Sequence, residues 1–240
     1  MSPLQIVVLA LVQAVTEFLP ISSSGHLILI PRLLGWGDQG LSFDIATNSG
    51  TLLAVILYFR RDLAAVAREA LAAPAVWRRD APAGARLAWL LALGTIPAAV
   101  VGLLAHGWIS TVGRNPLLIA CDLIVWGLLL GVADRFARER RDEGSLSSRD
   151  ALLVGCAQAL ALVPGTSRSG ITITALLLLG LSRPAAARFS FLLAVPVGLL
   201  AEAKDLLDHL LGDGLESGAL AAMLLGVVVS AVAGYAVVAW

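Results

Sequence analysis

The stretch Gln13-Ala-Val-Thr-Glu17-Phe-Leu-Pro20-Ile-Ser-Ser-Ser-Gly25-His26 interrupts an apolar region that runs from residue 3 to residue 35. A second stretch, Gln158-Ala-Leu-Ala-Leu-Val-Pro164-Gly-Thr-Ser167-Arg168-Ser169-Gly170-Ile-Thr172, interrupts another apolar region between residues 151 and 182. Carboxylate, imidazole, guanidinium and hydroxyl groups are costly to hold in hydrocarbon, so polar groups in such places indicate function. Because the two stretches look like distant copies of each other, we expect one site built from two halves.

The composition predicts an all-α integral membrane protein. Of the 240 residues, 58% are hydrophobic and only 14% are charged, with a mean hydropathy of +0.87. Soluble domains carry about 25% charged residues. The formal net charge is zero, so no nucleic-acid partner is expected. Cys121 and Cys156 lie in apolar runs, and we expect small core residues there rather than a disulfide or metal ligands.

Five apolar runs approach the roughly 20 residues that a helix needs to cross a bilayer. They are residues 41–59, 87–105, 117–134, 185–201 and 218–239, and each is predicted to be a transmembrane helix. The regions 3–35 and 151–182 are broken by proline, glycine and serine at 20–26 and 164–170, which leaves each half too short for a span. This pattern predicts two re-entrant helical hairpins, whose irregular tips are buried in protein or line a cavity.

Arginine predicts the orientation of the chain in the membrane. The connections 60–86 and 135–149 are rich in arginine, so both are expected on the cytoplasmic side, and 106–116 is expected outside. The first hairpin then starts and ends outside, and the second starts and ends inside. The two halves therefore have opposite orientation, and Gln13 and Pro20 recur in the second half as Gln158 and Pro164.

These observations predict a single membrane domain over 1–240 with an inverted-topology repeat. Repeat one is expected over 1–134, a cytoplasmic loop over 135–149, and repeat two over 150–240. Inverted repeats place their binding sites near the membrane midplane, where the repeats meet. Repeat two has two predicted spans where repeat one has three, so a final helix is expected to be missing after Trp240.

At residues 17–26 and 164–172 the chain resembles the undecaprenyl-diphosphatase family, also called bacitracin-resistance proteins. The resemblance continues through Phe43-Asp44, Gly50–Val55, Tyr58–Arg61 and Phe189–Pro196, and so covers nearly the whole chain. In two places the chain departs from the family pattern. The family's last helix, with its aromatic-Tyr-Arg ending, is absent here. Asn48-Ser49 precedes Gly50 where members usually have Gln or His followed by Leu.

The resemblance implies a hydrolase that converts undecaprenyl diphosphate to undecaprenyl phosphate and inorganic phosphate. It would recycle the carrier lipid of cell-wall synthesis and confer resistance to bacitracin, which competes for the same lipid. The resemblance also implies a bacterial plasma (inner) membrane protein whose site opens to the outside, with Mg²⁺ or Ca²⁺ as a cofactor. A homodimer is left open.

Glu17 and Gln13 are one helical turn apart, so their side chains project from the same helix face. A carboxylate at this depth should be paired, protonated or bound to a cation. Glu17 is therefore expected to be a general base or a ligand of a divalent metal, or else a structural partner of Arg168. Gln13 is its expected hydrogen-bonding companion. The planar fork of Arg168 suits bidentate recognition of phosphate.

The rest of the expected site comes from the two broken stretches. Backbone N–H groups around Gly165 and Gly170, with Ser167, Ser169 and Thr172, are expected to hold phosphate oxygens, and Ser169 is alternatively an N-cap. The family motif implies Ser23 as a nucleophile, with an activated water as the alternative. Ser22 is an expected phosphate contact, and His26 an expected general acid or base. Asp44 and Asp122 are given no role.

Two rival functions share features of this pattern. An acid-phosphatase-like lipid phosphatase would require a histidine six residues after the arginine of its motif, but Thr174 stands at that place, so this class is rejected. A transporter or flippase of polyprenyl phosphate remains the alternative, because inverted repeats and paired hairpins are also transporter architecture.

Overall fold

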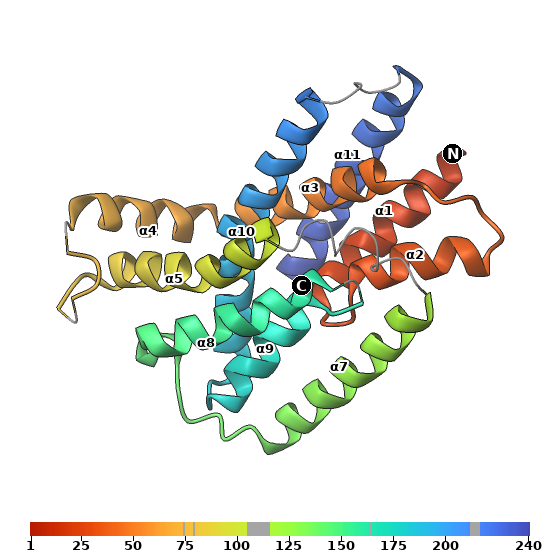
Figure 1. Ribbon diagram of the computed structural model, residues 1–240. Coiled ribbons are helices and arrows are strands. Elements are labelled where there is room, and N and C mark those ends of the chain that lie inside the picture. The colour runs from red at the N-terminus through yellow and green to blue at the C-terminus, as the bar shows by residue number, and fades with distance from the viewer. Residues whose placement is uncertain (74, 79, 105–115, 164, 212–216) are drawn as a thin grey trace.

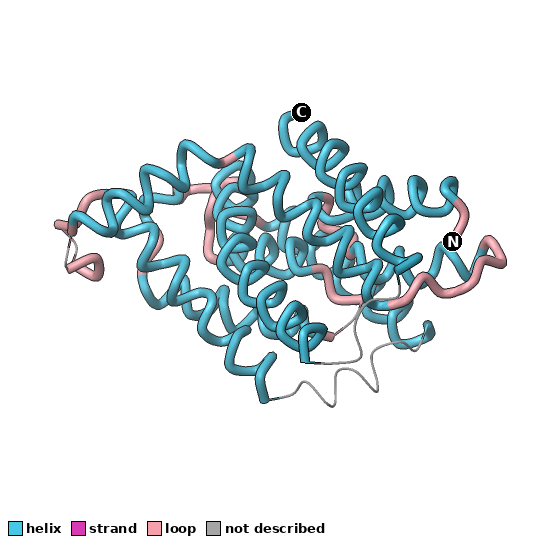
Figure 2. The backbone as a smooth tube through the Cα atoms, turned by 90° about the horizontal axis from the view of Figure 1, so that it is seen from above, coloured by secondary structure: helices cyan, strands magenta, loops and turns pink. Residues whose placement is uncertain are grey.

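In the computed structural model, residues 1–73, 75–78, 80–104, 116–163, 165–211 and 217–240 are described. Within these ranges every regular element is helical, and no strand is present (Figure 2). In the part of the chain that the structure describes, five helices are long and apolar enough to cross a membrane, at Leu41–Tyr58, Ala83–Leu104, Pro116–Phe136, Arg183–Lys204 and Leu220–Ala239. The predicted all-helical, multi-pass membrane fold is therefore confirmed.

Each broken apolar region forms a helical pair. The first pair is α1 (Pro3–Phe18) and α2 (Ser23–Leu33), and the second is α8 (Ser148–Ala159) and α9 (Arg168–Leu178). Between α8 and α9 lies a short 3₁₀ turn, η2 (Leu160–Leu162). A serine N-cap precedes each of these four helices, because Ser2, Ser22, Ser147 and Ser167 each accept a hydrogen bond from a backbone N–H three residues later. Helices of 11 to 16 residues are too short to span a bilayer comfortably, as the sequence predicts for hairpins.

The remaining helices are α3 (Leu41–Tyr58), α4 (Arg60–Ala72), α5 (Ala83–Leu104), α7 (Pro116–Phe136), α10 (Arg183–Leu211) and α11 (Ser217–Ala239), with a 3₁₀ turn η1 (Glu143–Ser145) (Figure 1). In the arginine-rich 60–86 connection, α4 runs beside α5. α10 extends ten residues beyond the predicted span 185–201, which has consequences for the site.

The hairpins pack against spans of the opposite half. α1 lies mainly against α11, and α8 lies mainly against α5. Glycine permits the second contact, because a Cβ on Gly155 would lie only 2.5 Å from the carbonyl oxygen of Gly94. This reciprocal packing is the arrangement that an inverted repeat predicts, although the proposed repeat boundaries stay a prediction.

The buried core is centred on α10. Phe189, Leu192 and Leu193 are fully buried and pack with apolar residues of α3, α5, α8 and α9. α7 instead lies at the edge, in contact with α9 and α2, and exposes a long apolar face that includes Leu128 and Val132. Such a face suits lipid. Cys121 and Cys156 are also exposed, so the expectation of core cysteines was wrong.

Ion pairs join the halves at the arginine-rich end. Arg188 of α10 bonds to Asp62 of α4 at 2.5 Å and to Glu143 of η1. Arg141 bonds to Asp150 in the first turn of α8 at 2.6 Å. These contacts fix the base of the second hairpin and thereby position its tip.

Candidate active site

The tips of the two hairpins meet in the middle of the structure. Arg168, the first residue of α9, donates from Nη2 to Glu17 Oε1 at 2.5 Å. The Ser169 hydroxyl donates to the backbone oxygen of Glu17 at 3.2 Å. The approach is close, because a Cβ on Gly170 would lie 3.1 Å from the Pro20 carbonyl oxygen. The structure therefore brings the two polar stretches together, as the sequence predicts.

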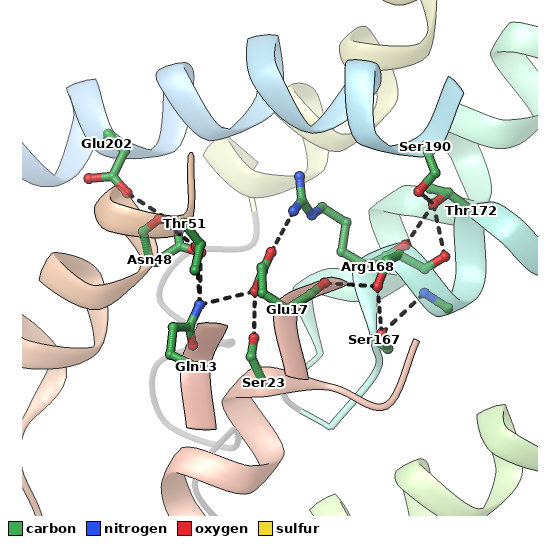
Figure 3. Close-up of polar contacts among 12 residues, drawn as sticks. Gln13, Glu17, Ser23, Asn48, Thr51, Ser167, Arg168, Thr172, Ser190 and Glu202 are labelled. Carbon is green, nitrogen blue, oxygen red and sulfur yellow. Dashed lines mark hydrogen bonds and ion pairs between the residues drawn. The ribbon is translucent and has the colours of Figure 1, made fainter. Parts of the chain in front are cut away.

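Three side chains surround the Glu17 carboxylate (Figure 3). Besides Arg168, Oε2 accepts from the Ser23 hydroxyl at 2.6 Å and from Gln13 Nε2 at 3.1 Å. The Glu17 side chain is 12% exposed and that of Arg168 28%. A carboxylate this buried needs charged or hydrogen-bonding partners, and here it has both. A serine hydroxyl bonded to a carboxylate is the arrangement that activates an oxygen nucleophile.

The loop before α9 is ordered by its own side chains. Ser167 rather than Ser169 is the N-cap, and its Oγ accepts from the Gly170 N–H at 3.1 Å. Gly165 has a φ of +101°, which favours glycine, and a Cβ there would lie 3.0 Å from the Ile119 carbonyl oxygen. The Thr172 hydroxyl turns toward α10 and bonds to Ser190 at 2.6 Å. The amino end of α9, with Arg168 as its first residue, points at the Glu17 carboxylate.

A cavity of about 220 Å³ lies beside this contact. Glu17, Arg168 and hydroxyls of both hairpins form its polar wall, and Ser22, Ser23, Ser167 and Ser169 are among them. α3 and α10 supply the apolar lining, with Leu52, Val55, Ala194, Val197 and Gly198, and α3 adds the polar side chains of Asn48 and Thr51. A cavity that is polar on one side and mainly apolar on the other suits a charged headgroup on an apolar chain.

Some predicted site residues do not line this cavity. Gln13 donates to Glu17 without lining the cavity, while Gly165, Gly170 and Thr172 shape the loop before α9 and its first turn. His26 Nδ1 lies 2.7 Å from the Ser22 carbonyl oxygen one turn back in its own helix, a contact that favours the tautomer with the proton on Nδ1. The structure therefore does not bring His26 into the Glu17 contacts, and its role as acid or base stays a prediction.

Several residues that support the site were given no role by the sequence pattern. Asn48 Nδ2 donates to Glu202 Oε1 at 3.1 Å, and Gln13 Nε2 lies 3.5 Å from both Asn48 Oδ1 and Thr51 Oγ1. Asp122 accepts from the Thr166 hydroxyl at 2.5 Å and from Trp126 Nε1 at 3.0 Å. A polar side chain within a membrane span is costly, and this was the feature of the sequence that pointed to Asn48 and Asp122.

The side chains around the cavity can be compared with those that a divalent cation requires. Among the described residues there is no group of three histidine, cysteine or acidic side chains that could hold a metal. The cavity offers one carboxylate, Glu17, with several hydroxyls and the Asn48 amide. Mg²⁺ is commonly bound by one or two carboxylates together with substrate phosphates. The residues thus fit an ion carried mainly by a diphosphate, with Glu17 as its protein ligand.

Comparison with known proteins identifies the family of the chain. Residues 6–240 match the family described as bacitracin resistance protein BacA. Undecaprenyl-diphosphatase 2 of Stutzerimonas stutzeri is 54% identical over 238 residues, which cover 98% of this chain and 87% of the relative. Undecaprenyl-diphosphatases of Magnetococcus marinus and Trichlorobacter lovleyi are 53% and 51% identical, over 96% and 100% of this chain and 86% and 88% of those relatives. The chain therefore belongs to the bacitracin resistance protein BacA family.

Proposed function

We propose that this chain hydrolyses undecaprenyl diphosphate to undecaprenyl phosphate and inorganic phosphate, and so recycles the carrier lipid of cell-wall synthesis. One observation carries the proposal: Glu17 and Arg168 meet across the two hairpins at the polar wall of a cavity whose other wall is mainly apolar. The relatives named undecaprenyl-diphosphatase support the substrate. No contact in the described structure favours the transporter alternative.

The terminal phosphate is bound by Arg168 and by backbone N–H groups at the start of α9, with Ser22, Ser167 and Ser169 as further contacts. These groups compensate the charge that develops during phosphoryl transfer, which depends mainly on positioning and electrostatics. Arg168 must exchange part of its contact with Glu17 for phosphate oxygens. Glu17 is then free to accept a proton.

Ser23 attacks the terminal phosphorus, and its proton passes to Glu17 over the 2.6 Å hydrogen bond. The bond from phosphorus to the bridging oxygen breaks, undecaprenyl phosphate leaves, and water then cleaves the phosphoserine. In the alternative route Glu17 activates a water directly, and Ser23 positions that water. His26 is retained as a candidate acid for the leaving group. A Mg²⁺ or Ca²⁺ carried by the diphosphate and held by Glu17 would neutralise further negative charge.

The location follows from the arginine distribution. The arginine-rich connections face the cytoplasm of a bacterial plasma membrane, and the cavity opens to the outside. Bacitracin, which competes for the same lipid, would then act on the side where the substrate is met. The exposed face of α7 is available to lipid or to a second copy of the chain, and sedimentation of the detergent-purified protein distinguishes monomer from homodimer.

Release of inorganic phosphate from undecaprenyl diphosphate by the purified protein tests the function. Wild-type protein should release phosphate, and Arg168→Ala should abolish release while expressing normally. Arg78→Ala is the matched control, because Arg78 is 64% exposed and pairs with Asp80 away from the hairpin tips. A protein that moves the lipid between leaflets without releasing phosphate would be a transporter. Near-normal release by Arg168→Ala would overturn the site.

A further inference from the structure

A second carboxylate, Glu202, reaches the network around Glu17 from α10. Its Oε1 accepts from Asn48 Nδ2 at 3.1 Å, and its Oε2 accepts from the Ser49 hydroxyl. Asn48 in turn stands 3.5 Å from Gln13, which donates to Glu17 at 3.1 Å. Figure 3 shows these side chains in one row, from Glu202 through Asn48 and Gln13 to Glu17. A carboxylate thus stands at each end, with two amides between them.

The hydrogen-bonding chemistry of these four side chains fixes which of them donates and which accepts at each contact. An ionised carboxylate only accepts hydrogen bonds, whereas an amide side chain has a donating nitrogen and an accepting oxygen. Glu202 therefore draws the NH₂ group of Asn48 toward itself and leaves the Asn48 oxygen facing Gln13. Facing that oxygen, Gln13 presents its own NH₂ group, which also reaches Glu17. Thr51 favours the same orientation of Gln13. Its hydroxyl proton is donated to the Asn48 backbone oxygen at 2.8 Å, so the hydroxyl oxygen accepts from Gln13 Nε2.

We propose that Glu202 is a positioning residue, which acts through Asn48 to hold Gln13 in the orientation that donates to Glu17. Without Glu202 the Asn48 amide is free to rotate by half a turn and present its nitrogen to Gln13. Gln13 would then be drawn to turn its oxygen toward the Glu17 carboxylate, and two acceptors would repel each other. The kinetic consequence rests on the proposed function, because Glu17 is the proposed base.

Exchange of the amide and the carboxylate provides the sharpest test. Glu202→Gln is isosteric and lets Asn48 rotate, so kcat should fall about tenfold, the scale of one hydrogen bond to a charged group, while KM changes little. Asn48→Asp places two carboxylates face to face and should also lower kcat. In the double variant N48D/E202Q, the amide now at position 202 donates to the carboxylate now at position 48. That carboxylate also accepts from Gln13, so Gln13 keeps its wild-type orientation. Its kcat should recover to within about threefold of wild type.

Asp80→Asn is the matched control, because the Asp80 carboxylate is 70% exposed and pairs with Arg78 away from the site, so its kcat should equal that of wild type. If the contact between Asn48 and Glu202 merely joined α3 to α10, both single variants would have a lower thermal midpoint but an unchanged kcat per folded protein. That result, or a double variant no better than the single ones, would overturn the positioning role.

An infrared measurement needs no substrate and so separates this inference from the proposed reaction. The carboxylate stretching band that disappears in Glu17→Gln belongs to Glu17. The band should move in Glu202→Gln, return in N48D/E202Q and stay in place in Asp80→Asn. A Glu17 band unchanged in Glu202→Gln would overturn the inference even if wild-type protein hydrolysed the lipid. A failure of wild-type hydrolysis with the expected band shifts would instead count against the proposed function alone.

Discussion

The Arg168 guanidinium lies 2.5 Å from the Glu17 carboxylate, although 151 residues separate the two along the chain. Glu17 lies in the last turn of α1 and Arg168 is the first residue of α9, so the cation of one hairpin neutralises the anion of the other. Neither charge could be buried at low cost alone. Under the proposed function, a phosphate-bearing substrate would compete with Glu17 for Arg168, and its binding would release the proposed base.

Arg168→Lys tests whether the shape of the guanidinium matters beyond its charge. Lysine keeps the positive charge but loses the planar fork that contacts two oxygens at once. We expect kcat/KM for undecaprenyl diphosphate to fall at least about 100-fold, since a bidentate phosphate contact is worth several kcal/mol during phosphoryl transfer. Phosphate release measured over a range of substrate concentrations checks this. Arg78→Lys should behave as wild type. An Arg168→Lys variant with wild-type activity would show that Arg168 acts through its positive charge alone and not through its planar fork.

The three neighbouring serines of the first hairpin should differ sharply in importance. Ser23 donates to Glu17 at 2.6 Å, whereas the contact of Ser24 is a long one, 3.3 Å, to the Ser22 hydroxyl. Ser23→Ala should lower kcat at least about 100-fold, the scale of losing an activated nucleophile or its positioning. Ser24→Ala should stay within about threefold of wild type. Capture of a phosphoserine at residue 23 by mass spectrometry would favour the covalent route over the water route.

Much of this site could be predicted from the sequence because its signals are local. Proline, glycine and serine break two apolar regions at 20–26 and 164–170, and regions of that length cannot hold two complete spans. Glu17 lies three residues before the first break and Arg168 lies within the second, so their meeting followed once the two breaks were placed at one site. The helix positions confirm this, with α1 ending at Phe18 and α9 beginning at Arg168.

The supporting contacts could not be predicted, because they depend on how helices are rotated against one another. Glu202 lies just after the predicted span 185–201, where polar residues lower the hydropathy, yet α10 continues to Leu211 and carries Glu202 to Asn48. Asp122 contacts Thr166 only because α7 packs on the loop before α9. For His26, spacing alone suggested a catalytic neighbour, whereas its ring turns back to the Ser22 carbonyl of its own helix.

The contact between Asp122 and Thr166 should hold the proposed phosphate-binding loop in place. The Thr166 hydroxyl lies 2.5 Å from Asp122, and Thr166 lines the cavity directly before Ser167 and Arg168. Thr166→Val removes the hydrogen bond with little change in shape, and we expect kcat/KM to fall about tenfold. Thr95→Val is the control, since Thr95 is equally buried but bonds within α5 to Leu91. Equal activities of the two variants would show that the loop needs no support from α7.

Gly155 should be essential for the packing of the second hairpin on α5. A Cβ at this position would lie 2.5 Å from the Gly94 carbonyl oxygen, which belongs to backbone and cannot move freely. Gly155→Ala should therefore destabilise the protein by about 1–3 kcal/mol, as overpacking of a close contact does. Thermal unfolding in detergent measures this effect. Gly127→Ala on α7 is the control, because nothing lies within 4 Å of the added Cβ, and its midpoint should not fall.

Asp150 should make the base of the second hairpin sensitive to acid. Burial of its carboxyl opposes ionisation, but donors from Arg141 and Ser147 outweigh burial and hold the pKa of Asp150 below its ordinary value of 3.8. Because the folded pKa is the lower one, ionised Asp150 contributes stability that is complete above pH 3.8 and is lost as the pH falls through the folded pKa.

Asp150→Asn should therefore lower the free energy of unfolding at neutral pH by about 1–2 kcal/mol, since it weakens both the helix cap and the ion pair with Arg141. The difference from wild type should shrink as the pH is lowered below about 3.8. Thermal midpoints of both proteins in detergent, measured from neutral pH down to about pH 3, check the sign. Asp80→Asn, at an exposed ion pair, should show little difference at any pH. A gap between Asp150→Asn and wild type that widened in acid would contradict the lowered pKa, because the carboxyl would then be favoured in its protonated form.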